Sequence, residues 1–184
     1  MDTTENHVVV KAYERAVKLL EIRLHTEFEL RNKLKRRGFN SDDIDQVIQK
    51  MTELGYINDA QFAEVYLDNL VRYKSHGYFM LLKKLLERGI DKNSATQLLD
   101  ENLSLETEQK IAQEFLDKSR TFLENVRPSR KDFTDTRSSQ KQVAGIPRKV
   151  RDKKNQPDKL KAAQSLQRKG FRSEVIRAVI SSQF

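Results

Sequence analysis

The chain has 184 residues, of which 37% are hydrophobic and 34% are charged, and its formal net charge is +8. The absence of cysteine excludes a disulfide framework, a thiolate zinc site and a cysteine nucleophile. No apolar run approaches the ~18 residues that a membrane span needs, so we expect a cytoplasmic protein without a membrane partner. The large charged fraction and the small aromatic fraction of 8% favour an elongated or repetitive shape with much surface.

Apolar residues recur at three- and four-residue spacing along most of the chain, which is typical of amphipathic helices. The successive stripes begin at Val9, Leu30, Ile44, Phe62, Leu81, Leu98 and Ile111. Thr26 followed by Glu29, and Asn58 followed by Gln61, have the spacing of capping boxes at helix starts. Because no segment alternates with a period of two residues, the sequence predicts an all-α fold.

One short turn sequence occurs three times, as "LKRRGF" at 34–39, "LLERGI" at 85–90 and "LQRKGF" at 166–171. Each copy has a leucine four residues before the glycine and a bulky apolar residue directly after it. We expect each glycine to end a helix in the left-handed conformation. The apolar residues that follow also coincide, so this is an internal repeat. It predicts an elongated, curved array of three three-helix units, at residues 8–55, 58–103 and 105–184.

The third unit is longer because it contains a basic, proline-bearing insert at residues 127–159. This window holds 11 basic and 4 acidic residues, or +7 of the net charge of +8. It also contains all three prolines and follows no helical stripe, so we expect a mobile segment. A solvated loop and a nucleic-acid-binding arm both remain open for it. Its binding candidates are Arg148, Lys149, Arg151, Lys153 and Lys154.

Two further basic groups lie in the helical part. The first group surrounds the second helix, and the second group flanks the aromatic stretch "VRYKSHGYF" at 71–79, whose rings could stack on bases. The members are Arg31, Lys33, Lys35 and Arg36 in the first group and Arg72, Lys74, Lys83 and Lys84 in the second. The basic residue before each turn glycine (Arg37, Arg88 and Lys169) is explained as well by helix-end capping as by binding.

The spacing of apolar residues around the turn glycine is also that of a DNA-reading helix-turn-helix, which is an alternative interpretation. That motif usually has a small residue four positions before the glycine, whereas all three copies here have leucine. A bihelical packing unit is therefore favoured over a DNA-reading one.

An enzyme is not favoured. The three histidines, His7, His25 and His76, lie far apart without metal-ligand spacing. No glycine-rich phosphate loop is present. We therefore expect no catalytic residues, no metal and no cofactor.

The stretches "RLHTEFELRNKL" at 23–34 and "GYINDAQFA" at 55–63, taken with the three turns, resemble the RecX family over all of the chain except residues 127–159. The resemblance implies tandem three-helix repeats that bind in the groove of the RecA filament on single-stranded DNA. It implies modulation, usually inhibition, of the ATPase, strand exchange and coprotease activities of RecA. Asn58 stands where the family often has Asp. We expect a monomer; the alternatives are a direct nucleic-acid-binding protein that uses its basic insert and helix-turn-helix-like units, and a helical scaffold for another partner.

Overall fold

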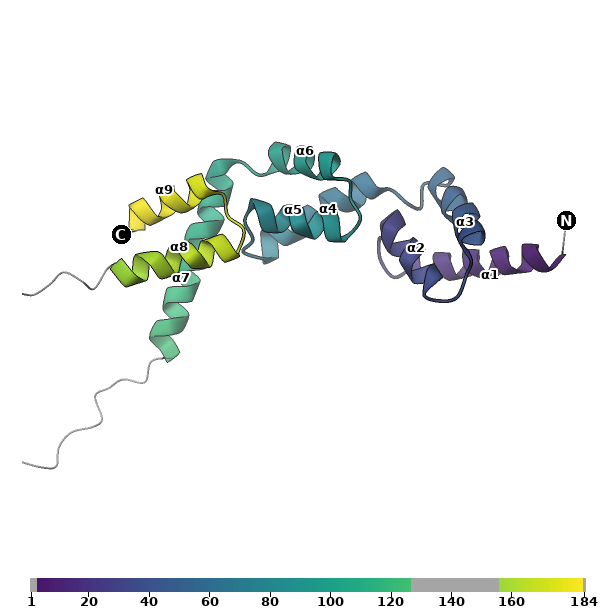
Figure 1. The fold of residues 1–184 in the computed structure, drawn as a ribbon, viewed down its shortest axis with the longest axis horizontal. Coiled ribbons are helices and arrows are strands. Elements are labelled where there is room, and N and C mark those ends of the chain that lie inside the picture. The colour runs from purple at the N-terminus through teal and green to yellow at the C-terminus, as the bar shows by residue number, and fades with distance from the viewer. Residues whose placement is uncertain (1–2, 127–155, 184) are drawn as a thin grey trace, which may run out of the picture.

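The computed structural model describes residues 3–126 and 156–183, and within these ranges the protein is entirely helical. The first unit contains α1 (Thr3–Leu20), α2 (Glu27–Lys35) and α3 (Ser41–Glu53), which pack on one another around a core of their own. The second unit contains α4 (Asp59–Tyr73), α5 (Tyr78–Glu87) and α6 (Lys92–Asn102). The third contains α7 (Leu105–Val126), α8 (Gln156–Arg168) and α9 (Ser173–Gln183). The units follow one another along the long axis of the molecule (Figure 1), which confirms the all-α array of three-helix repeats.

The repeated turn has the predicted geometry in every unit. Gly38, Gly89 and Gly170 have φ angles of 88°, 86° and 79°, the left-handed conformation that ends a helix. Leu34, Leu85 and Leu166 are completely buried. Each leucine belongs to the same apolar cluster as the helix that follows its own glycine.

The predicted caps form in part. Thr26 Oγ1 accepts the N–H of Glu29 at 3.1 Å, and Asn58 Oδ1 accepts the N–H of Gln61 at 3.0 Å. In a capping box the Glu29 carboxylate would also accept the N–H of Thr26. This part of the prediction is wrong, because the Glu29 carboxylate binds Arg23 and Arg88 instead.

The units are joined by a junction that occurs twice in equivalent form. The start of the second helix in one unit meets the glycine turn of the next unit. Thr26 Oγ1 donates to the carbonyl of Arg88 at 2.6 Å, and the N–H of Gly77 donates to the carbonyl of Lys169 at 3.0 Å. Thr26 and Gly77 both stand 12 residues before the turn glycine of their own unit (38 − 26 and 89 − 77).

The first helix of the next unit completes each junction with a carboxylate. Asp59, at the start of α4, accepts the N–H of Glu27 at 2.9 Å, and Glu108 in α7 accepts the N–H of Tyr78 at 3.1 Å. Free N–H groups at the start of α2 and α5 therefore find acceptors in the neighbouring unit. The array is thus held together at helix ends.

The last residues of the predicted insert at 127–159 belong to a helix, because α8 begins at Gln156. Pro157 is compatible with this start, since a proline in the first turn gives up an N–H that has no partner there. The rest of the insert, with its predicted mobility, lies outside the described residues. Where the structure is described, no helix is long and apolar enough to span a bilayer.

Candidate functional site

Of the predicted basic residues around α2, two are held by other groups. The Arg31 guanidinium binds Glu27 at 2.7 Å and also pairs with Asp45, and these carboxylates raise its pKa further. Arg31 lines a shallow groove between α2 and α3, and Glu53 lines the same groove. A phosphate would have to displace two carboxylates from Arg31.

Lys33 is tied to His25, which is buried. The Lys33 ammonium can only donate, so at 2.7 Å the Nε2 atom of His25 must accept. Nδ1 then carries the proton and donates to the carbonyl of Arg23 at 2.9 Å. Burial lowers the pKa of His25, and the charges of Arg23 and Lys33 lower it further, so the neutral ring is favoured.

Lys35 and Arg36, together with the turn residue Arg37, are exposed at the end of α2. The turn cations differ, because Arg88 is engaged in a junction, whereas Lys169 lies 5.2 Å from the centre of the Phe115 ring. Capping alone therefore does not describe all three.

The predicted group around α4 and α5 is partly paired. Arg72 binds Asp68 at 2.8 Å, and Lys84 binds Glu87 at 2.8 Å, with Lys83 at 4.0 Å from the same carboxylate. These are surface pairs within one helix, which contribute little to stability and exchange readily. Lys74 is exposed at the end of α4.

Three lysines from different elements gather around His76, which lies between α4 and α5. Burial lowers the pKa of His76, and the positive charges of Lys169, Lys84 and Lys74 lower it further. Within the described residues, Nδ1 of His76 is buried without a hydrogen-bond partner. We call Lys74, Lys84, Lys169 and His76 the junction cluster, because Lys169 comes from the third unit and the others from the second.

Sequence reasoning found two members of this cluster, Lys74 and Lys84, and missed the role of the other two. The sequence analysis named His76 only as one of three scattered histidines, and it left capping and binding both open for Lys169. A usable signal was the position of Gly77, 12 residues before its turn glycine and equivalent to Thr26. Candidates Arg148, Lys149, Arg151, Lys153 and Lys154 lie outside the described residues.

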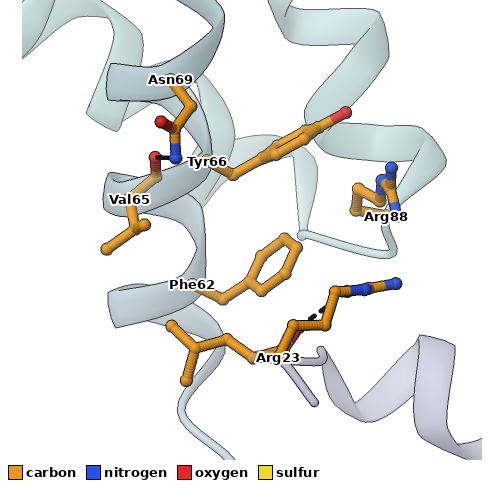
Figure 2. A pocket seen from close by; sticks show the side chains of 7 residues that line it. Arg23, Phe62, Val65, Tyr66, Asn69 and Arg88 are labelled. Carbon is orange, nitrogen blue, oxygen red and sulfur yellow. Dashed lines mark hydrogen bonds between the residues drawn. The ribbon is translucent and has the colours of Figure 1, made fainter.

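A pocket of about 350 Å³ opens where the first and second units meet. Figure 2 shows Phe62, Val65, Tyr66 and Asn69 along one side of α4, with Arg23 and Arg88 facing them from two other segments. Leu24 completes the lining. Across the described part of the chain, no group of three or more His, Cys, Asp or Glu could hold a metal ion.

Glu29 lies beside this pocket and connects its two arginines. Its carboxylate pairs with Arg23 at 2.8 Å and with Arg88, whose guanidinium also lies 4.9 Å from the centre of the Tyr66 ring. Burial acts to raise the pKa of Glu29, but hydrogen bonds from Arg23 and Arg88 outweigh it, so the pKa is lowered. Glu29 is therefore ionised at neutral pH.

Known proteins resemble the chain in sequence. A family model described as the first three-helix domain of RecX matches residues 12–51. Regulatory protein RecX of Prosthecochloris aestuarii is 34% identical over 91 residues, which are 50% of this chain and 60% of that protein. The same-named protein of Bacillus velezensis is 29% identical over 172 residues, which cover 94% of this chain and 55% of the relative. The chain thus spans less than two thirds of the length of these relatives.

Solved structures agree over nearly the whole chain. The crystal structure of RecX from Lactobacillus salivarius has a TM-score of 0.73 and 22% identity, covering 96% of this chain and 97% of that one. A second crystal structure of regulatory protein RecX has a TM-score of 0.73 and 19% identity, covering 97% of this chain and 74% of that one. The chain is therefore similar in sequence to proteins named regulatory protein RecX, and it shares the fold of two solved RecX structures.

Proposed function

We propose that this protein binds the RecA filament on single-stranded DNA and modulates RecA, with inhibition of its ATPase, strand exchange and coprotease activities as the most frequent outcome. Similarity to proteins that are named regulatory protein RecX supports this proposal. We further propose that the protein acts in the cytoplasm as a monomer and without a cofactor.

The junction cluster is the observation that carries the proposal. A long filament offers repeated protein and phosphate surfaces, and an elongated array can follow it. The charges of Lys74, Lys84 and Lys169 all act on His76 between α4 and α5, so positive charge is concentrated where the second and third units meet. The exposed Lys35 and Arg36 offer a further contact on the first unit.

A direct nucleic-acid-binding protein is the second candidate, favoured by one observation. Most of the net positive charge lies in residues 127–159, and basic tracts bind phosphates without a fold of their own. In this case naked single-stranded DNA would be the ligand and the insert would carry the affinity.

Four proteins distinguish the two functions: the unaltered chain, a deletion of 128–155, Lys74→Glu with Lys84→Glu, and Lys11→Glu with Lys110→Glu. The last pair is the matched control, since both lysines are exposed and the charge change is the same. Each protein is assayed for inhibition of the RecA filament ATPase and for binding to labelled oligothymidylate by anisotropy. We expect the deletion to weaken naked-DNA binding and to retain most of the inhibition.

The junction-cluster variant should lose inhibition, and the control should not. Each phosphate contact on a single strand contributes about −0.7 to the slope of the logarithm of the affinity for single-stranded DNA against the logarithm of the salt concentration. The loss of two contacts should therefore flatten this slope by about 1.4. If the deletion abolishes inhibition while the junction-cluster variant inhibits normally, the insert-based function replaces the filament proposal.

A further inference from the structure

The pocket between the first two units has an apolar wall that the core does not cover. Phe62, Val65, Tyr66 and Asn69 follow one another at helical spacing along α4 and face Arg23 and Arg88 (Figure 2). Leu24 is 43% exposed and Val65 is 47% exposed, although both lie at this seam. A volume of about 350 Å³ accommodates one or two side chains, so the pocket is the size of a short peptide contact.

The charges at the pocket edge are not balanced. Arg23 and Arg88 share the single carboxylate of Glu29, which leaves one positive charge in excess. Each guanidinium has five N–H donors, and the bonds described for both arginines use only some of them. Both side chains are partly exposed, at 43% for Arg23 and 35% for Arg88. A second carboxylate can therefore bind at this edge without displacing Glu29.

The pocket suits a peptide better than a nucleotide base. The Tyr66 ring is already stacked with Phe62, at 5.5 Å between centroids, and approached by Arg88 at 4.9 Å. Phe62 is only 6% exposed. The most exposed apolar side chains of the lining are Leu24 and Val65, which are aliphatic and offer no ring for base stacking.

We propose that this pocket binds a peptide segment of a partner protein, with an aliphatic side chain against Leu24 and Val65 and an adjacent carboxylate on Arg23 and Arg88. The inference goes beyond the proposed function and does not depend on it, because it rests on the pocket alone. It gives the first two units a protein-binding surface that is separate from the junction cluster.

The test uses the full chain and methyl NMR of its Leu and Val residues. The probe is a capped Asp-Leu-Leu-Asp peptide, compared with the amide form Asn-Leu-Leu-Asn and with oligothymidylate. We expect the acidic peptide to shift the methyl signals of Leu24 and Val65 in a saturable manner. The amide form should bind at least about tenfold more weakly, because it loses charge-assisted hydrogen bonds.

Val65→Glu should abolish the shift at Leu24, because it places a carboxylate of the chain itself in the pocket. Val10→Glu is the control, since Val10 is 48% exposed on α1 and the change is identical. Equal binding of both peptides, or normal binding to Val65→Glu, would overturn the proposal. Larger shifts of the Leu24 and Val65 methyls with oligothymidylate would reassign the pocket to nucleic acid, and no shift with any probe would remove it as a site.

Discussion

Single carboxylates hold the units of this protein together. Glu108 has no exposed surface, yet it accepts the N–H of Tyr78 at 3.1 Å and the N–H of Arg172 at 3.0 Å and pairs with the Arg172 guanidinium. The same guanidinium lies 4.9 Å from the centre of the Tyr78 ring. A buried charge of this kind is tolerated because every neighbour donates to it.

We expect Glu108→Gln to lower the free energy of unfolding by about 3 kcal/mol, because it leaves the half-buried Arg172 without its counter-charge and turns a buried amide donor toward other donors. Glu106→Gln, an exposed change in the first turn of the same helix, should cost about 0.5 kcal/mol or less. Urea unfolding followed by circular dichroism measures both. Equal midpoints for the two variants would contradict the role of Glu108.

His25 makes stability depend on pH. Its pKa in the folded protein is lowered from the ordinary value of 6.5, first by burial and then by Arg23 and Lys33. The unfolded chain therefore binds this proton more readily. The stabilisation is complete above pH 6.5 and is lost as the pH falls from there toward the lower pKa of the folded state.

We expect His25→Asn to be less stable than the unaltered chain at pH 8 and to show a smaller loss of melting temperature between pH 7 and pH 5.5. His76, whose pKa is also lowered, continues to titrate in this variant and accounts for the remaining slope. Thermal melts across that range measure the difference. An unchanged pH slope in His25→Asn would show that other groups govern it.

At the scale of the element, one turn serves two different purposes. Gly38 and Gly170 have nearly the same φ angle, but an added Cβ would meet nothing within 4 Å at Gly38. At Gly170 it would lie 2.4 Å from the backbone nitrogen of Met80 in the preceding unit. The left-handed conformation ends the helix in both cases, whereas Gly170, unlike Gly38, also permits close approach of two units.

Gly38→Ala should therefore cost only the conformational strain of about 1–2 kcal/mol. Gly170→Ala should cost clearly more, because a backbone atom cannot move aside as a side chain can. Urea unfolding compares the two, and hydrogen exchange at the Gly77 and Phe79 amides, which bond to the Lys169 and Gly170 carbonyls, reports the junction directly. Equal costs with unchanged exchange would show that the junction accommodates the added Cβ without being disturbed.

At the scale of the whole molecule, the array depends on few contacts between units. Arg88 joins the second unit to the first through Glu29, and its backbone carbonyl accepts from Thr26. Since each unit has its own core, loss of such a contact should loosen the array without unfolding the units.

We expect Arg88→Met to cost about 1–2 kcal/mol and to increase the spread of orientations between the first two units. Arg72→Met is the matched control, because the Arg72–Asp68 pair is exposed within one helix and should contribute little to stability. Small-angle X-ray scattering of the three proteins tests this. Identical scattering curves would show that the remaining bonds suffice to hold the units.

The sequence by itself determined the helices, the turn glycines and the leucines buried beneath them. These features depend on local backbone preference and on apolar spacing, both of which are written in neighbouring residues. The resemblance to the RecX family also comes from the sequence, through the stretches at 23–34 and 55–63 and the three turns. The turn repeats predicted the three-unit array because a helix with one apolar face must bury it against its neighbours.

Only the tertiary structure decided which charges are engaged and which are brought together. Arg31 is paired with Asp45 on another helix, and Arg88 is paired with Glu29, which is 59 residues away in the sequence. Lys169 joins Lys74 and Lys84 because a turn of the third unit docks on the start of α5. Such pairings depend on how the units stack, and they join residues far apart in the sequence, which the spacing of neighbouring residues does not predict.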